Sequence, residues 1–171
     1  MAEHRSPIAA CDFETIDWDR WTPSERATLL FVVRDDRILL IHKKRGLGAG
    51  KVNGPGGRLA AGEDPLAGAL REVREEVGVT VENVEQMGEL SFQFTDGHSI
   101  HCHVFRAHNL VGLPQVTDEA TPFWVPLDEI PYEDMWDDDR LWLPLMLQGR
   151  RFRGRVLFDG ERMVGHEIVT V

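Results

Sequence analysis

Apolar and polar positions alternate along much of the chain in patterns that predict strands separated by short turns. Residues 27–33 form a continuous apolar run, typical of a buried strand, and residues 37–41 follow after an Asp35-Asp36 turn. Residues 89–94 and 100–105 alternate on either side of Asp96-Gly97, which is a strong hairpin signal. Three further strands are expected toward the C-terminus, at residues 123–125, 151–158 and 163–171.

A helical periodicity covers residues 65–77. Asp64 suits the N-cap position, Pro65 the first helical position and Gly78 the C′ position. A second, mostly apolar helix is expected over residues 137–148, kinked near Pro144. On the first helix, one stripe is expected to face the core, made of Leu66, Leu70, Val73 and Val77. The whole pattern predicts an α+β fold with a mixed sheet and no internal repeats.

The length of 171 residues is enough for one sizeable core and too short for two ordinary domains. We expect one domain over residues 25–171, preceded by an extension, residues 1–24. This extension is either loose or attached to the domain through Trp18 and Trp21.

The net charge of −10 argues against a nucleic-acid polymer or an anionic membrane surface as partner. A phosphorylated small molecule stays compatible with it, because bound cations invert the local field. Cys11 and Cys102 suggest neither a disulfide scaffold nor a zinc cluster, and no signal peptide or membrane-spanning run is evident. We therefore expect a monomer in the cytoplasm.

The most specific pattern sets glycines, acidic residues and one arginine at fixed spacings: Gly57, Glu63, Arg71-Glu72-Val73, Glu75-Glu76 and Gly78-Val79. Its three clustered glutamates are spaced i, i+3 and i+4, so they share one helix face. Crowded carboxylates repel one another unless a cation lies among them, and rigid oxygen ligands suit a hard divalent ion. A bare acidic triplet would more often be a solvated helix face, but the flanking residues favour a metal site.

This pattern matches the Nudix box without a gap, and the chain resembles the Nudix hydrolases, which cut diphosphate bonds with magnesium or manganese. The resemblance implies the Nudix fold, a mixed β-sheet sandwiched between helices. Segments outside the box resemble the branch that hydrolyses oxidised purine nucleoside triphosphates such as 8-oxo-dGTP and so sanitises the nucleotide pool. These segments are residues 43–57, Asp118-Glu119, residues 134–139 and residues 143–154.

Carried over by position, the resemblance implies the following metal ligands: the carbonyl of Gly56 and the carboxylates of Glu72, Glu75, Glu76 and Glu119. We count these four glutamates as catalytic, together with Arg71, whose favoured role is an ion pair that orients Glu63 or Glu75. The implied nucleotide contacts are Thr28, Lys43, Asn53, Pro55, Gly56, Gly57, Arg58, Trp136, Asp137, Asp138 and Asp139. Trp136 offers a flat face for stacking on the base, and Phe92 or Phe94 could lie opposite it.

Asp138 and Asp139 could read a purine edge. Two adjacent buried aspartates titrate apart, so one could donate to O6 while the other accepts from the base nitrogens. Moving that proton could also accommodate an oxidised adenine such as 2-hydroxy-dATP. The alternative is that Asp137, Asp138 and Asp139 only cap the following helix.

Several sequence features leave alternatives open. His101 and His103 lie two apart on one strand face and are a possible ligand pair, but no third soft ligand is evident, so zinc is disfavoured. The substrate could also be a dinucleoside polyphosphate or a nucleotide sugar, or the domain could bind nucleotide without catalysis. Four positions depart from the branch pattern and reduce its aromatic base pocket: Leu47, Val52, Pro55 and Asp137.

Overall fold

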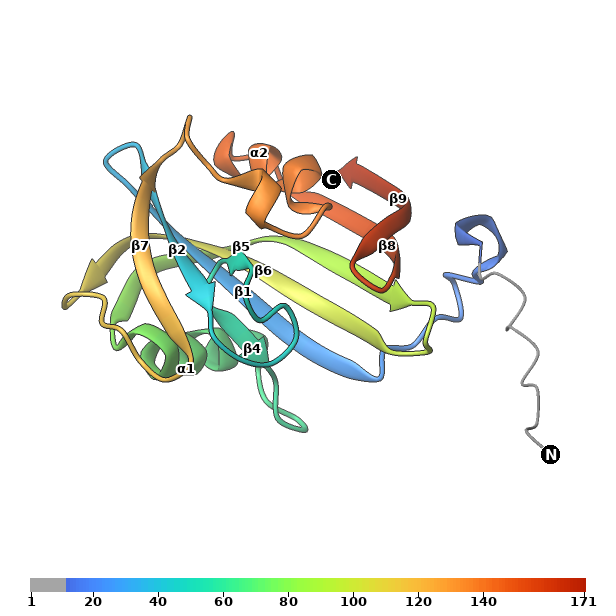
Figure 1. The fold of residues 1–171 in the computed structure, drawn as a ribbon, viewed down its shortest axis with the longest axis horizontal. Helices are drawn as coiled ribbons and strands as arrows, with labels where there is room; N and C mark the ends of the chain where they lie inside the picture. Colours follow the sequence, from blue (N-terminus) through green and yellow to red (C-terminus); the bar gives the residue numbers. More distant parts are fainter. Residues whose placement is uncertain (1–11) are drawn as a thin grey trace.

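A computed structural model describes residues 12–171 (Figure 1). Its strands are β1 (Glu25–Arg34), β2 (Arg37–Lys43), β3 (Val52–Asn53), β4 (Gly56–Arg58), β5 (Thr80–Phe94), β6 (Ser99–Val111), β7 (Ala120–Pro126), β8 (Phe152–Asp159) and β9 (Arg162–Thr170). Its helices are α1 (Pro65–Val77) and α2 (Asp139–Leu147), with short 3₁₀ turns η1 (Phe13–Thr15) and η2 (Tyr132–Asp134).

The strands form one mixed sheet in the order β3-β2-β1-β6-β5-β8-β9, while β4 pairs with β1 and β7 pairs with β2. The β1–β6 and β5–β8 pairs are parallel, and the other pairs are antiparallel. Parallel neighbours require long connections, so strands distant in sequence lie side by side. The expected mixed sheet is confirmed.

The two faces of the sheet carry separate cores, as the alternation of β1 shows. Phe31 packs in a cluster with Trp142 of α2, whereas Leu30 and Val32 pack in a second cluster with Val73 of α1. Figure 1 shows α1 and α2 on opposite sides of the sheet. The α+β sandwich expected from the sequence is therefore confirmed.

Helix α1 begins and ends where its sequence predicts. The Asp64 side chain accepts a hydrogen bond from the backbone N–H of Ala67 at 3.0 Å, Pro65 opens the helix, and Gly78 ends it with φ of 74°. Val73 and Val77 are fully buried. Leu66, however, is 39% exposed, so the prediction that it faces the core is wrong. It lies in the first turn of the helix, which begins at Pro65.

The structure corrects several predicted boundaries. Strand β5 starts at Thr80, nine residues before the predicted start, because an irregularity between Gln86 and Gly88 and a positive φ at Asn83 break the alternation that sequence reading relies on. Between residues 41 and 65, where the sequence pattern predicts no strand, the structure has the short strands β3 and β4. Helix α2 begins at Asp139 and contains Pro144.

The described part of the N-terminal segment, residues 12–24, contacts the body of the protein. The indole N–H of Trp21 donates to Oε1 of Gln93 at 2.9 Å, and its ring lies 5.8 Å from that of Trp18. Ser24 exchanges hydrogen bonds with Ser99. Residues 1–11, including Cys11, lie outside the described residues. Within residues 12–171 no helix has the length and apolar character needed to cross a membrane.

Candidate active site

One face of α1 gathers carboxylates beside the sheet. Glu72 and Glu76 are buried there, while Glu75 points toward solvent at the same end of the helix. Glu119 arrives from the loop before β7, and its oxygen lies within 4.8 Å of one oxygen each from Glu72 and Glu76. Three carboxylates from two distant segments thus converge on one point.

Burial and mutual repulsion disfavour the charged form of this cluster. Burial raises the pKa of Glu76 to about 8, with Glu72 and Glu119 adding to the effect, although the N–H of Gly56 at 3.2 Å and the charge of Lys43 oppose it. Burial also raises the pKa of Glu72. A divalent cation would offset both the burial of these charges and their mutual repulsion, and all the available ligand atoms are hard oxygens. The residues present therefore fit Mg²⁺ or Mn²⁺.

Arg71 holds the outer edge of this cluster. Its guanidinium donates to both oxygens of Glu63, at 2.8 and 2.9 Å, to Glu72 at 2.9 Å and to Glu75 at 3.1 Å. It also reaches the carbonyl of Arg58 at 3.1 Å. These hydrogen bonds lower the pKa of Glu63 to about 2. Arg71 therefore orients carboxylates, as its favoured role predicts, and it does not line the cavity.

Strand β4 approaches the cluster closely, and only glycine permits it. A Cβ on Gly57 would lie 2.5 and 2.6 Å from the two carboxylate oxygens of Glu72, and a Cβ on Gly56 would collide with the carbonyl of Thr28 on β1. The two glycines therefore let the backbone of β4 lie between β1 and the carboxylates.

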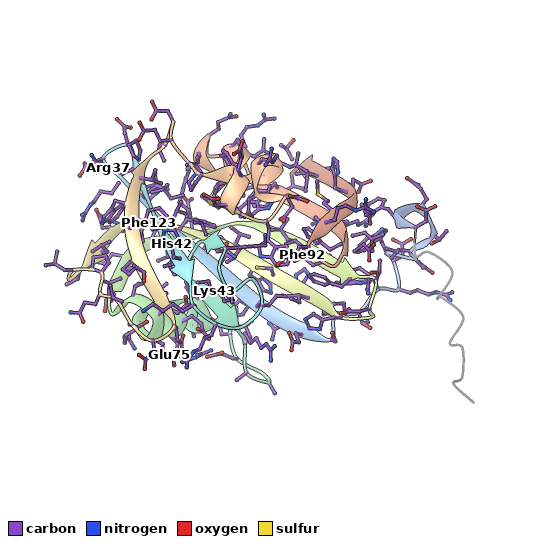
Figure 2. All side chains as sticks on the ribbon, viewed as in Figure 1. Arg37, His42, Lys43, Glu75, Phe92 and Phe123 are labelled. Atoms are coloured by element: carbon purple, nitrogen blue, oxygen red, sulfur yellow. The ribbon has the colours of Figure 1, made fainter. Side chains whose placement is uncertain are left out.

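A cavity of about 420 Å³ extends from these carboxylates across the sheet. Figure 2 labels three of its lining residues, Lys43, Glu75 and Phe92, which come from β2, α1 and β5. The sequence-predicted residues that line it are Thr28, Lys43, Asn53, Gly56, Gly57, Arg58, Glu72, Glu75, Glu76, Phe92, Glu119, Trp136, Asp138 and Asp139. Segments from both halves of the chain thus build a single elongated site.

Buried polar atoms without partners mark the far end of the cavity. Oδ1 of Asp138, Oδ2 of Asp139 and Oγ1 of Thr28 are buried and have no hydrogen-bond partner among the described residues. Such atoms are costly unless a ligand or water satisfies them. All three residues line the cavity, so the aspartate end is suited to hydrogen-bond a polar ligand edge, and Thr28, the register partner of Gly57, adds a polar atom nearer the carboxylates.

The two aspartates are held differently. The indole N–H of Trp142 donates to Oδ2 of Asp138 at 2.7 Å, yet burial still raises the pKa of Asp138 to about 6. The pKa of Asp139 is raised well above its usual range, mainly by burial and then by the charge of Asp138. Asp138 makes no capping hydrogen bond at the start of α2. The alternative that these residues only cap the helix is therefore wrong for Asp138.

Aromatic rings form the wall beside the aspartates. Trp136 meets Phe158 edge-on at 5.1 Å and Phe94 edge-on at 6.2 Å, and the ammonium of Lys51 lies 5.2 Å from the Trp136 ring. Phe92 packs against Phe158 in the same cluster as Trp136, so it does not lie opposite Trp136 as the sequence suggested. Asn53 uses its Oδ1 to accept from the N–H of Gly54 at 2.8 Å, so its amide NH₂ is the group left for a ligand.

Two predicted contacts are not part of this lining. The Oδ2 of Asp137 accepts from the N–H of Met163, and the carbonyl of Pro55 accepts from the N–H of Leu30. Val52 is buried in the core. Among the four departures from the branch pattern, only Leu47 lines the cavity.

Sequence reasoning missed several lining residues. Arg45 lines the cavity and pairs with Glu119 at 3.0 Å. Ile100 and Cys102 of β6 form apolar wall beside the aromatic rings. The hairpin at Asp96-Gly97 pairs Phe92 with Ile100 and Leu90 with Cys102. Extending the period-two alternation across that hairpin would have placed both residues on the wall.

The matched family model is the NUDIX domain, over residues 23–146, and the chain belongs to this family. It is 44% identical to the oxidized purine nucleoside triphosphate hydrolase of Danio rerio over 142 residues, 82% of this chain and 91% of the relative. The Mus musculus protein of the same name is 41% identical, with 78% and 86% covered. The solved Mutator MutT protein from Bacillus halodurans superposes with a TM-score of 0.76 at 28% identity, over 84% of this chain and 97% of that one.

Proposed function

We propose that this protein hydrolyses oxidised purine nucleoside triphosphates to the monophosphate and pyrophosphate, and so sanitises the nucleotide pool. The supporting observation is one cavity with two unlike ends. Converging carboxylates lie at one end, and buried aspartate oxygens without partners lie at the other. The names of the vertebrate relatives, which cover most of this chain, agree with this assignment.

In the proposed mechanism, Glu72, Glu75, Glu76, Glu119 and the carbonyl of Gly56 hold Mg²⁺, which Mn²⁺ can replace. When bound, the metal supplies charge neutralisation for phosphate oxygens and a more acidic water. Glu72 and Glu119 are the two candidates for the group that accepts the proton of the attacking water. Glu76 is the more deeply buried carboxylate, and its oxygen accepts from the N–H of Gly56.

The other residues position the substrate. Lys43 supplies a mobile positive charge to the phosphates beside the carboxylates. Gly57 and Arg58 bring backbone and a guanidinium to the same end of the cavity. Arg71 fixes Glu63, Glu72 and Glu75, so it acts through the carboxylates. Near-attack geometry depends on such rigid placement.

The purine is read at the aspartate end. A guanine-type edge presents two donors, N1–H and an exocyclic amine, and a charged aspartate accepts hydrogen bonds from both. A neutral aspartate donates a hydrogen bond to O6. The raised pKa values of Asp138 and Asp139 support one shared proton between them. Trp136 and Phe92 then stack on the base, and Thr28 and Asn53 contribute further polar contacts.

Steady-state kinetics over damaged and normal purine triphosphates, dinucleoside polyphosphates and nucleotide sugars test this proposal. The expected result is a wide lead for the oxidised purine triphosphates, magnesium dependence, and pyrophosphate as product. Glu76→Gln should abolish that release. A higher kcat/KM for a nucleotide sugar than for the oxidised purine triphosphates would assign the protein to another substrate class. Tight nucleotide binding without turnover would favour a non-catalytic domain.

The wider assignments follow from the same proposal. We assign residues 25–171 to the catalytic domain and residues 1–24 to an N-terminal extension. The partner is a small nucleotide, with no nucleic-acid polymer and no membrane. We also propose a monomer that works in the cytoplasm, consistent with the strongly acidic composition.

A further inference from the structure

Two histidines and a glutamate lie together on the sheet, away from the carboxylates of α1. Glu89 of β5 is the register partner of His103 on β6, and His101 lies two residues along the same strand. Because side chains alternate across a sheet, these three share one face of the β5–β6 pair. The intervening residues, Leu90 and Cys102, pack in the core on the opposite face.

The three side chains are close enough to share one ion. Oε1 of Glu89 lies 3.6 Å from Nδ1 of His103 and 3.9 Å from Nε2 of His101. One ligand atom from each of the three residues can be chosen so that all lie within 4.8 Å of one another. Tetrahedral zinc with bonds of about 2.0–2.1 Å holds its ligand atoms about 3.3 Å apart. Rotation of the side chains must therefore bring the ligand atoms closer together than the 4.8 Å within which they lie here.

The shielding of the two histidines from water and the direction of their pKa shifts favour a bound cation. His103 is 12% exposed and His101 25% exposed, so both are largely shielded from water. Burial lowers the pKa of both imidazoles, which favours the neutral form that binds metal. The Oγ of Ser91 lies 3.4 Å from Nδ1 of His101, an outer contact that leaves Nε2 free for an ion.

Two neighbouring side chains, Arg26 and Gln86, disfavour a bound cation at this cluster. Arg26, the register partner of His101, adds positive charge on this face. The amide of Gln86 lies 3.0 Å from Nδ1 of His103 and must turn away when an ion binds there. The carboxylates of Glu89 and Asp64 offset the charge of Arg26 at His103.

We propose that Glu89, His101 and His103 bind a transition-metal ion of the zinc class at a site separate from the α1 carboxylates. Two imidazoles and one carboxylate are a donor set that suits zinc and leaves a fourth position for water. Magnesium prefers oxygen ligands, so the two sites differ in the ions that they select. Zinc here links β5 to β6 behind the cavity wall, because Phe92, Ile100 and Cys102 of the same strands line the cavity.

Calorimetric titration of the full chain with zinc, in excess magnesium to fill the carboxylate site, tests the proposal. We expect one zinc equivalent in the wild type and at least a roughly tenfold weaker Kd in His101→Ala and in His103→Ala, as expected when a metal contact is removed. His108→Ala is the matched control, since His108 lies on β6 and pairs with Glu85 instead. Equal affinity in the wild type and a double His101→Ala, His103→Ala variant would overturn the proposal.

Two further variants keep the result interpretable. Glu89→Gln retains the shape of the side chain and should weaken zinc binding without loss of folding, as judged by circular dichroism. Glu76→Gln disrupts the α1 cluster and should leave the zinc equivalent in place. Loss of zinc binding in Glu76→Gln, with retention in His103→Ala, would assign the ion to the α1 carboxylates and contradict the separate site.

Spectroscopy gives an independent readout. The Trp21 ring lies 6.4 Å from that of His101, so Co²⁺ or Ni²⁺ bound at the site should quench the fluorescence of Trp21. The quenching should therefore be smaller in Trp21→Phe. Cobalt should show no thiolate charge-transfer band, because Cys102 is on the other face. Zinc at 100 times its Kd should also raise the melting temperature by roughly 5–10 °C. A thiolate band, or quenching that survives Trp21→Phe in full, would count against this geometry.

Discussion

Arg71 and Glu63 form a two-point ion pair in which Nε and Nη2 of the guanidinium each donate to one carboxylate oxygen, at 2.8 and 2.9 Å. The remaining Nη1 of the same guanidinium reaches Glu72 and Glu75. Glu63 in turn accepts from the N–H of Ala60 at 3.0 Å. The loop before α1 and the carboxylate face of the helix are thus joined through one side chain.

Replacing Arg71 with alanine should therefore disturb catalysis more than substrate binding. We expect kcat to fall by about 10–100-fold, as for other residues that orient metal ligands, with KM changing far less. Arg74→Ala is the matched control, because Arg74 is an exposed arginine of the same helix. Steady-state kinetics of both variants provide the check, and an equal loss in Arg74→Ala would refute the positioning role.

A methyl group on Gly57 should displace the carboxylate of Glu72, which lies where the new Cβ would be. Since that carboxylate is the free end of a side chain, the protein should fold with a similar melting temperature. A displacement of about 1 Å is enough to lower the rate by about 100-fold. Gly56→Ala should instead destabilise the fold, because its Cβ would meet the backbone of Thr28. Full activity in a folded Gly57→Ala variant would contradict this prediction.

The metal-free protein should lose stability as pH rises from about 4.5 to about 8. Folding raises the pKa of Glu76 from 4.5 to about 8, so the folded state binds the extra proton within this window, and the unfolding free energy falls as that proton is lost. The part of the decrease that comes from Glu76 should be no more than about 5 kcal/mol, and the raised pKa values of Glu72, Asp138 and Asp139 add to it in the same direction. Urea unfolding with a chelator present measures it. Glu76→Gln should make the profile less steep, while the slope from Asp138 and Asp139 remains. An unchanged profile in that variant would contradict the prediction for Glu76.

Asp138→Asn should change which purine triphosphate is preferred. An asparagine cannot carry the charge that accepts from a guanine-type edge, so kcat/KM for 8-oxo-dGTP should fall by about 10–100-fold. Asp137→Asn is the matched control, because Asp137 faces the N–H of Met163 outside the cavity lining. The ranking of substrates should persist in Asp137→Asn, and its persistence in Asp138→Asn would remove Asp138 from base recognition.

Local chemistry made helix α1 predictable. Its first and last residues are set by Asp64, Pro65 and Gly78, whose effects act within one turn of the chain. Spacing placed Glu72, Glu75 and Glu76 on one helix face, whereas Glu119 was proposed only from the family resemblance. The exposure of Leu66 could not be predicted in the same way, because it depends on how the helix packs against the rest of the fold.

The cavity was less predictable because distant segments build it. The sequence could propose Asp137, Asp138 and Asp139 together, but only the turn before α2 decides which of them face the ligand space. Likewise, His101 and His103 lacked a third partner in the sequence, and the register of β5 against β6 supplies Glu89. Strand register is a tertiary property when an irregularity such as that at Gln86–Gly88 interrupts the alternation.

The parallel β5–β8 pair has a consequence for synthesis of the chain. Phe158, on β8, lines the same cavity as Glu25 and Thr28 on β1, so the cavity closes only when nearly the whole polypeptide has emerged from the ribosome. The acidic helix, by contrast, lies in the first half of the chain. A nascent chain that stalls before residue 152 would therefore carry the carboxylates of α1 with no enclosed place for a base.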